Sequence, residues 1–485
     1  MTDVSLAAVL PLLGAFVLPL TRHGILRPLG PVIGPILLAA CALILFAAWS
    51  AYDVPYAVAL GSFAPPMGIT FYIDDLALLF ALAVPLTTLV LWPGESDPAA
   101  TGRQSLTLLL AGSLTGLALS GDLFNVYVFY ELAAVASYGL VVGDGRSPAY
   151  VAAFRYLMIS ALGSVVGLIG IAIIYFKTGT LNLADLSTLS GELADPQGMA
   201  AFAMLVIGFG VKAEAFPVNG WVPEVYGAVG KRVAALLAGL ASKLAVLVIV
   251  RILILVFPHD ETRQLLLVLG ILGVAVGELA AWQARDIPRM LAWSSIGQLG
   301  VVFVAFSLPG KAGVIAGVTV AMHHLVVKSA LFLLADRWDR AIESLKGAAS
   351  TSRIGAALFV LFSLSLLGLP PLPGFWSKFL VLGGLAASAS PLQLLAMGTI
   401  LAGTVIEGAY LLRVVVTFYA RPDAAVRVPG QRAGNLLGAG LFALVLLTAA
   451  VMINPLWQGL EVLAERAVDT NGYQHTVLGD REAGR

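Results

Sequence analysis

Several long apolar segments of this chain carry a charged side chain near their middle. Glu131 lies in DLFNVYVFYELAAVASYG, Lys212 in MLVIGFGVKAEAF and Lys243 in LASKLAV. A charge at the centre of a membrane helix costs from about 3 to more than 10 kcal/mol, and such residues commonly mark the path of an ion or a proton. The types and positions of these residues therefore predict ion transport.

Glu131 and Lys212 form the first candidate pair. Glu131 follows Asp122 by nine residues, which is roughly 14 Å along a helix and close to half of a ~30 Å hydrocarbon core. Burial disfavours a charged ammonium, whereas a nearby carboxylate favours it. Lys212 could therefore change protonation when its partner moves. Alternatively, the two residues form a permanent ion pair, or Glu131 binds a neighbouring backbone group.

Lys243 is eleven residues into its predicted helix. That depth argues against the alternative that its side chain reaches the membrane surface. Arg251, nearer the end of the same helix, is interpreted as extending its charged group to that surface.

The second half of the chain carries a similar series. His324 and Lys328 in AMHHLVVKSALF are four residues apart, share one helix face, and predict a proton relay because histidine titrates near neutral pH. His323 faces elsewhere and could be an ordinary core residue. No third ligand accompanies the histidines, so no metal site is expected. Lys378 follows in GFWSKF, and Glu407 in LAGTVIEGAYLLR is either a further relay residue or a structural partner of Arg413.

The composition places these residues in a membrane protein. Of 485 residues, 59% are hydrophobic and 12% charged, against about 25% charged in soluble domains. The formal net charge is zero, so nothing suggests nucleic-acid binding. The single cysteine, Cys41, excludes Cys₄-ligated clusters and a disulfide framework. No phosphate-binding loop or dinucleotide motif occurs, and no cofactor is expected in this chain. The apolar N-terminus lacks the basic start of a cleaved signal and predicts a first membrane span.

Apolar segments of about 20 residues predict membrane-spanning helices. By this measure the chain is an all-α polytopic membrane protein with about fourteen transmembrane helices. Pro217 breaks the seventh helix, and Pro371 and Pro373 break the twelfth. The predicted helices cover residues 4–20, 31–50, 74–92, 104–120, 122–142, 152–176, 198–226, 232–256, 264–283, 289–308, 312–335, 353–386, 393–420 and 434–454.

The two breaks are five helices apart, which predicts two five-helix repeats in opposite membrane orientations. The predicted domains are residues 1–103 with three helices, 104–256 as the first repeat, 264–420 as the second repeat, and 434–485 with the last helix and the tail. Lys and Arg concentrate in loops after odd-numbered helices, which places those loops in the cytoplasm and both termini on the other side. The segment 51–73 is then an external loop, and the tail after Leu456 could form a surface helix.

The motifs in combination resemble a known family, the antiporter-like membrane subunits of respiratory complex I, Mrp-type Na⁺/H⁺ antiporters and energy-converting membrane-bound hydrogenases. The matching stretches lie within about 70–420: YEL, VKAEAFPVNGWVPEVYG, LASKLAV, ARDIPRMLAWSSIGQLG, HHLVVKSALF and GLPPLPGFWSKF. The family has fourteen helices, breaks in the seventh and twelfth, and inverted repeats. The resemblance implies that Glu131 pairs with Lys212 and that protons move along Lys243, His324, Lys328 and Lys378. Some members of the family have Glu at the position of Lys378. With a lysine there, the chain resembles the complex I N-type, Mrp D-type and hydrogenase-type members more closely.

These features lead to one favoured hypothesis and two alternatives. The favoured hypothesis is that the chain is a proton-translocating subunit of a multisubunit complex in a bacterial or archaeal plasma membrane. Its proton movement would be coupled, through other membrane subunits, to redox chemistry or to cation exchange. In the redox case the complex would resemble an NADH:quinone oxidoreductase or a hydrogenase, with every redox centre on another chain. The first alternative is a Na⁺/H⁺ antiporter subunit without redox coupling. The second is a structural membrane anchor for a soluble oxidoreductase.

Overall fold

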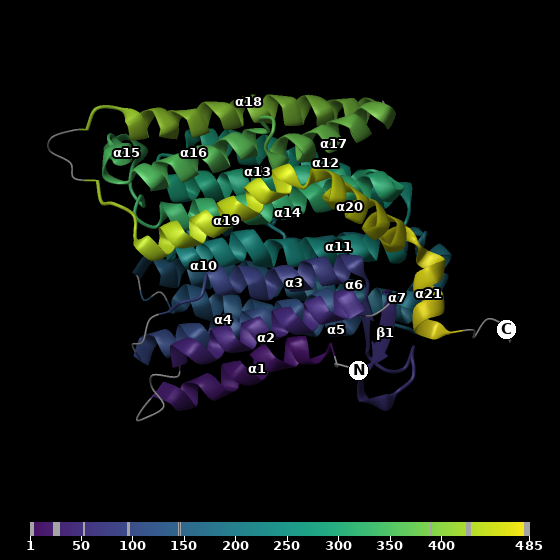
Figure 1. Ribbon diagram of the computed structural model, residues 1–485. Helices are drawn as coiled ribbons and strands as arrows, with labels where there is room; N and C mark the ends of the chain where they lie inside the picture. Colours follow the sequence, from purple (N-terminus) through teal and green to yellow (C-terminus); the bar gives the residue numbers. More distant parts are fainter. Residues whose placement is uncertain are drawn as a thin grey trace. The chain divides into compact units, whose positions relative to one another are not determined.

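The computed structural model describes residues 4–22, 30–51, 54–94, 98–143, 145, 147–388, 390–422 and 428–479. Helices make up most of these residues (Figure 1). The α-helices and strands are α1 (Leu6–Val17), α2 (Gly30–Ala51), β1 (Tyr56–Ala59), β2 (Thr70–Ile73), α3 (Asp75–Val90), α4 (Pro98–Leu119), α5 (Leu123–Val142), α6 (Ser147–Thr178), α7 (Leu183–Thr188), α8 (Pro196–Gly210), α9 (Val222–Ala228), α10 (Lys231–Ala235), α11 (Ser242–Leu255), α12 (Asp260–Gln283), α13 (Ile287–Ser307), α14 (Gly310–Ala335), α15 (Ala348–Thr351), α16 (Arg353–Leu367), α17 (Pro373–Ser388), α18 (Pro391–Tyr419), α19 (Ala433–Val451), α20 (Ile453–Val468) and α21 (Thr470–Leu478).

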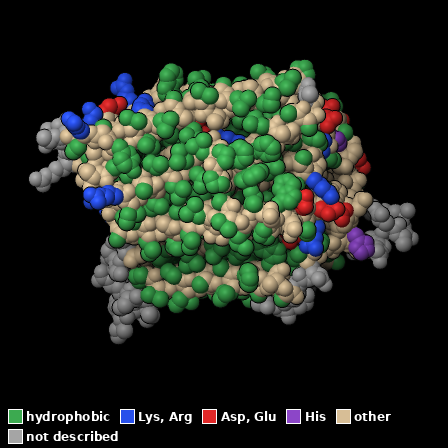
Figure 2. Space-filling model, turned by 45° about the horizontal axis from the view of Figure 1, so that its top comes forward, with side chains coloured by type: hydrophobic (Ala, Val, Ile, Leu, Met, Phe, Trp, Pro, Cys, Tyr) green, Lys and Arg blue, Asp and Glu red, His purple; other side chains and the backbone are tan. Residues whose placement is uncertain are grey.

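The helices have the lengths and composition of a multi-pass membrane protein. Nine segments within the described residues are long and apolar enough to cross a membrane: α2, α5, α6, the continuous helix Lys231–Leu255, α12, α13, α14, α18 and α19. Four further apolar helices are shorter, namely α1, α3, α8 and α16. Hydrophobic side chains are spread across the face in Figure 2, and most of the charged side chains lie toward its left and right ends. The count of fourteen spans stays a prediction.

Two compact units make up the chain. Unit 1 comprises Met1–Ala213, Ala241–Arg263 and Val462–Arg485, and unit 2 comprises Glu214–Leu240 and Gln264–Glu461. Within each unit the long helices run side by side, roughly parallel to one another (Figure 1). The four-part division into two repeats and two terminal segments stays a prediction.

Glycines let two long helices of unit 1 approach closely. A Cβ atom added at Gly208 of α8 would lie 2.7 Å from the Cα of Gly167 and 3.0 Å from the carbonyl oxygen of Gly163, both on α6. Only hydrogen fits between these backbones, which is the usual way in which small residues bring membrane helices together. This contact fixes the position of the end of α8, immediately before Lys212.

Unit 1 also contains a hairpin that the all-α prediction did not include. Strands β1 and β2 pair antiparallel inside the predicted external loop, with Tyr56 opposite Ile73. All four residues of β2 are aromatic or β-branched, as are Tyr56 and Val58 of β1, and such residues favour this conformation. Four residues are too few to stand out in the sequence. The predicted surface helix of the tail is present as α20 and α21. The Tyr473 ring of α21 lies 4.0 Å from the Tyr72 ring of β2, between centroids, so the tail packs on the hairpin.

Both predicted helix breaks occur. The chain leaves the α-helix between Gly210 and Val222, a stretch that includes Pro217. The second break lies between Leu367 and Pro373, where Gly368 takes a left-handed conformation with a φ of 81° that suits glycine. Pro371 lies within this break. Pro373 is instead the first residue of α17, a position where proline is favoured because its missing N–H has no helical partner.

Candidate functional site

Lys212 lies at the start of the first break and is only 3% exposed. Its ammonium nitrogen is 4.0 Å from the centroid of the Tyr130 ring on α5, and it makes no hydrogen bond among the described residues. The hydroxyl of Tyr130 donates a 2.7 Å hydrogen bond to the carbonyl oxygen of Gly208. The ring that faces the ammonium is therefore held in place by the end of α8.

Glu131, the predicted partner of Lys212, lies beside Tyr130 on α5 and is half-buried. The two charges interact electrostatically, but the carboxylate oxygen Oε1 of Glu131 makes no hydrogen bond among the described residues. An aromatic face, and not the carboxylate, contacts the ammonium. The two charged groups therefore attract each other at longer range, without a fixed ion pair between them.

Lys243 lies on α11, fully buried, and its ammonium donates a 3.0 Å hydrogen bond to the hydroxyl of Ser242. The turn directly before it, Leu236–Ala241, is a π-helix. Such wide turns inside α-helices are rare and are frequently found at functional sites. Because the whole side chain is buried within the protein, it does not extend to the surface, which was the alternative.

Arg251, further along α11, does not extend to the surface as its sequence position suggested. It is 8% exposed, and Asp74 is 1% exposed. Both guanidinium NH₂ groups donate to the Asp74 carboxylate, one of them at 2.8 Å. Asp74 also caps α3 by accepting from the backbone N–H of Ala77 at 2.8 Å. The interpretation of Arg251 as a surface-directed residue is wrong, because a buried carboxylate 177 positions earlier in the chain neutralises it.

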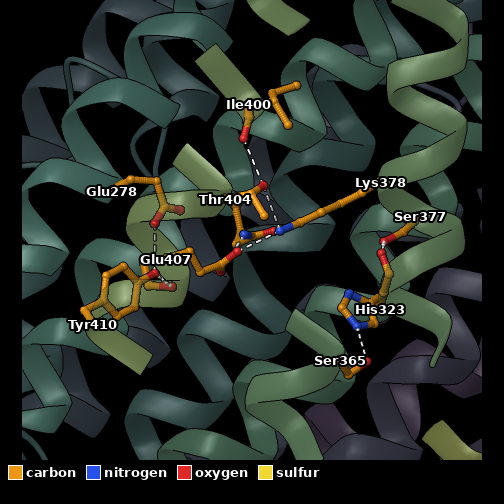
Figure 3. Close-up of polar contacts among 12 residues, drawn as sticks. Glu278, His323, Ser365, Ser377, Lys378, Ile400, Thr404, Glu407 and Tyr410 are labelled. Atoms are coloured by element: carbon orange, nitrogen blue, oxygen red, sulfur yellow. Dashed lines mark hydrogen bonds and ion pairs between the residues drawn. The ribbon is translucent and has the colours of Figure 1, made fainter. Parts of the chain in front are cut away.

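The two histidines of α14 point in different directions. His324 and Lys328 are both fully buried, one helical turn apart. His323 lies 2.9 Å, through Nε2, from the hydroxyl of Ser365 on α16 (Figure 3). The ammonium of Lys328 donates to the Ser294 hydroxyl at 2.6 Å and to the Leu291 carbonyl at 3.3 Å, both on α13. The predicted separation of His323 from the His324/Lys328 face is observed.

Lys378 and Glu407 form a direct ion pair in unit 2. The ammonium of Lys378 on α17 lies 2.7 Å from Oε2 of Glu407 on α18 and donates to the Thr404 hydroxyl at 3.2 Å (Figure 3). The amide of Gln298 on α13 donates to the other carboxylate oxygen of Glu407 at 2.8 Å. Arg413, the alternative partner, instead donates to the carbonyl of Ala284 at 2.7 Å. Glu407 therefore belongs with Lys378.

Three residues of this site were missed at the level of the sequence. Glu278 of α12 is 3% exposed, and its Oε2 accepts a 2.9 Å hydrogen bond from the hydroxyl of Tyr410 (Figure 3). Tyr410 is also 2.8 Å from the Ser294 hydroxyl. The available signal for Glu278 was a lone carboxylate in the apolar run GVAVGELAAW. Ser294 and Tyr410 carry no such signal, because hydroxyl side chains are common in membrane helices.

The candidate proton-carrying groups thus form one set in each unit. In unit 1 the set is Glu131, Lys212 and Lys243, and in unit 2 it is Glu278, His323, His324, Lys328, Lys378 and Glu407. No three His, Cys, Asp or Glu side chains within the described part of the chain come together as they would around a metal ion. What each set can do is accept and release protons inside apolar helices.

The chain is similar to known membrane proteins. A family model described as NADH:quinone oxidoreductase/Mrp antiporter, transmembrane, matches residues 120–405. The N-type subunit of the NADH-quinone oxidoreductase of Desulforudis audaxviator is 31% identical over 83% of this chain and 82% of its own length. The D-type subunit of the Na⁺/H⁺ antiporter of Alkalihalophilus pseudofirmus is 29% identical over 86% of this chain and 87% of its own.

The fold is also that of a solved protein. A chain of the membrane-bound sulfane sulfur reductase, an archaeal respiratory membrane complex, superposes with a TM-score of 0.89 at 26% sequence identity. The match covers 99% of this chain and 100% of that chain. The helices are therefore arranged as in a subunit of a multisubunit membrane complex.

Proposed function

The chain belongs to the NADH:quinone oxidoreductase/Mrp antiporter transmembrane family, and from that premise we propose that it is a proton-translocating subunit of a multisubunit membrane complex. One observation carries the proposal. Four lysines, Lys212, Lys243, Lys328 and Lys378, are at most 9% exposed, although they lie in or beside apolar helices. Burying so many ammonium groups is costly, and a structural role would need a fixed anion beside each.

The contacts of these lysines differ in kind. Lys378 has an anion in direct contact, the carboxylate of Glu407. Lys212 faces an aromatic ring, and Lys328 donates to a hydroxyl group. An aromatic ring and a hydroxyl group are both neutral, so they can contact the lysine whether it is charged or uncharged. We infer that the buried lysines change protonation during function.

The proposed order of events starts at the first break. A change in the attraction between Glu131 and Lys212 alters the proton affinity of Lys243. The proton then passes through His324 and Lys328 to Lys378. The two breaks supply backbone that can line a hydrated path, which membranes tolerate only where protein or water surrounds it.

The proposal extends to the setting of the complex. The relatives are a subunit of a quinone-reducing enzyme and a subunit of a Na⁺/H⁺ antiporter, so other membrane subunits are the expected partners here, in the plasma membrane of a bacterium or archaeon. Redox coupling is the favoured energy source. The 29% identity to an antiporter subunit supports cation exchange without redox chemistry as the second candidate.

Proton movement in vesicles that contain the purified complex tests the function. Lys212→Ala and Lys243→Ala are compared with Lys346→Ala, which alters an exposed lysine before α15. We expect the first two variants to lose at least about 90% of proton translocation, since positioned proton transfer commonly contributes 10²-fold or more, and the control to keep it. Full translocation by both variants in a normally assembled complex would refute the proposal and favour a structural anchor.

The two energy sources are separated in the same preparation. Under redox coupling, proton movement follows addition of an electron donor and does not need Na⁺. Under cation exchange, a Na⁺ gradient alone drives it. The proteins that co-purify with the chain give an independent answer, because electron-transfer subunits accompany the first case and small membrane subunits the second.

A further inference from the structure

Glu278 occupies a space that two glycines leave open. A Cβ atom added at Gly297 of α13 would collide with Oε1 of Glu278, and one added at Gly403 of α18 would lie 3.3 Å from its Cγ. Gly277, next to Glu278 on α12, would similarly meet the backbone of α13. The three helices therefore pack closely around this carboxyl group, and Figure 3 shows it directed toward Tyr410.

A continuous chain of hydrogen bonds joins this carboxyl group to Lys328. The Lys328 ammonium donates to the Ser294 hydroxyl at 2.6 Å. The hydroxyl oxygens of Ser294 and Tyr410 are 2.8 Å apart, and Tyr410 donates to Glu278 at 2.9 Å. All four residues are at most 3% exposed.

The number of protons limits the direction of these bonds. The Tyr410 hydroxyl lies within donating distance of both Ser294 and Glu278, but it has one proton. When Glu278 is ionised, its carboxylate can only accept, so that proton lies on the bond to Glu278. The Ser294 hydroxyl, which accepts from Lys328, can then turn its own proton toward the Tyr410 oxygen. In this state every donor in the chain points from Lys328 toward Glu278.

Such an alignment permits a concerted shift of protons. Lys328 gives one proton to Ser294, Ser294 gives its proton to Tyr410, and Tyr410 gives its proton to Glu278. The products are a neutral Lys328 amine and a neutral Glu278 carboxylic acid, while Ser294 and Tyr410 end as neutral hydroxyls with reversed bonds. Three O–H bonds form, and one N–H and two O–H bonds break, with no oxidant or cofactor required.

The receiving group is also linked to the ion pair of this unit. Glu278 and Glu407 interact electrostatically, and Glu407 lies against Lys378 at 2.7 Å. On α18, Glu407 and Tyr410 are three residues apart and share one face. When Glu278 is ionised, its charge repels that of Glu407, and this repulsion ends when Glu278 becomes neutral. A change in the protonation of Lys328 thus changes the charge on Glu278, which in turn changes the electrostatic repulsion acting on Glu407 in its pair with Lys378.

We propose that Glu278 is a proton-accepting residue of unit 2, which takes the proton of Lys328 through Ser294 and Tyr410 and holds it beside the Lys378–Glu407 pair. This inference rests on the proposed proton-translocating function and adds an acceptor to it. Its alternative is a purely structural network, in which the same bonds only anchor α12, α13 and α18 to one another.

Three substitutions test the acceptor. Glu278→Gln keeps an oxygen that accepts from Tyr410 but cannot take up a proton. Tyr410→Phe and Ser294→Ala each interrupt the chain of hydroxyls. The matched controls are Glu261→Gln, Tyr419→Phe and Ser295→Ala. Glu261 and Tyr419 are exposed, and Ser295 is a buried neighbour whose hydroxyl makes no hydrogen bond in the described part of the chain.

Proton translocation by the assembled complex in vesicles is measured first. We expect each test variant to lose activity at least about tenfold, each control to keep it, and Glu278→Asp to restore part of it. If Glu278→Gln and Tyr410→Phe match their controls while Lys243→Ala is inactive, the acceptor role of Glu278 is wrong and the proposed function stands. If Lys243→Ala is active as well, the proposed function itself fails.

Infrared difference spectra of the complex give a readout that a structural role would not produce. A change of pH should give the C=O stretch of protonated carboxylic acids, and the part of this band that comes from Glu278 should be present in the unaltered protein and in Lys243→Ala but missing in Glu278→Gln. The spectrum is also recorded on solubilised protein, so a variant that assembles poorly is still informative. An unchanged band in Glu278→Gln would overturn the proposal.

Discussion

The ammonium of Lys212 lies 4.0 Å from the centre of the Tyr130 ring, and within the described residues it makes no hydrogen bond to a carboxylate. The attraction between a cation and an aromatic face is worth about 0.5 to 2 kcal/mol. Removing one partner of a buried ion pair costs more, about 3 to 5 kcal/mol. The attraction holds the lysine in place without fixing its charge. Glu131, the neighbour of Tyr130 in the chain, acts on the same lysine from a longer range.

Tyr130 should therefore contribute to transport through its ring. Tyr130→Leu removes the aromatic face, and we expect translocation to fall about 2- to 30-fold, the range that corresponds to 0.5 to 2 kcal/mol. Tyr130→Phe keeps the ring and loses only the hydrogen bond to Gly208, so it should transport normally with a stability about 1 kcal/mol lower. Vesicle assays and thermal unfolding in detergent measure the two effects. Equal transport by the two variants would argue against a role for the ring.

The close approach of α6 and α8 should be intolerant of a single methyl group. Gly208→Ala places a carbon 2.7 Å from the Gly167 Cα, and neither backbone can move away cheaply. We expect a loss of about 1 to 3 kcal/mol of stability. The matched control is Gly440→Ala on α19, where no atom lies within 4 Å of the added carbon. Thermal unfolding of the two proteins should differ, and equal unfolding temperatures would contradict the packing described.

The Lys378–Glu407 pair should show strong non-additivity. Glu407→Gln leaves a buried ammonium without its anion, and Lys378→Met leaves a buried carboxylate, so each should cost about 3 to 5 kcal/mol. The double variant removes both charges and should be more stable than the sum of the single losses by at least about 1 kcal/mol. Unfolding of all four proteins provides the cycle. Strict additivity would show that the two side chains do not act on each other.

Arg251 should behave as a buried ion-pair partner. Arg251→Met leaves Asp74 charged and buried, and we expect a loss of about 3 to 5 kcal/mol of stability. The comparison is Arg263→Met, which breaks a more exposed contact with Asp260 at 3.2 Å and should cost no more than about 1 kcal/mol. If both substitutions cost the same small amount in thermal unfolding, the Asp74–Arg251 pair does not stabilise unit 1.

The orientation inferred from the basic loops can be read with cysteine labelling. Cys41 is buried, so an introduced exposed cysteine is the main target of an impermeant thiol reagent. Glu461→Cys, after the last predicted span, should be labelled in intact cells. Lys346→Cys should be labelled only in inverted membrane vesicles. The reverse pattern would place both termini in the cytoplasm.

The sequence by itself determined the class of protein, the two helix breaks and the four buried lysines. These features depend on local chemistry, because a hydrocarbon core requires about 20 apolar residues for each span and makes each charge within it conspicuous. Motifs around Glu131, Lys212, Lys243, Lys328 and Lys378 were also sufficient to indicate the family. Short or weak local signals were lost, as for the four-residue strands of the hairpin.

Only the tertiary structure decided which side chains meet. Asp74 and Arg251 are 177 residues apart, and Glu278 and Tyr410 are 132 apart, and nothing in their local sequence specifies either contact. The same holds for Tyr130, an aromatic residue among many, which proved to be the contact of Lys212. A hydrogen bond or an ion pair forms only when its two atoms come within about 3 Å of each other. Whether they do depends on how whole helices pack, and close helix contacts such as those at Gly208 and Gly297 determine that packing.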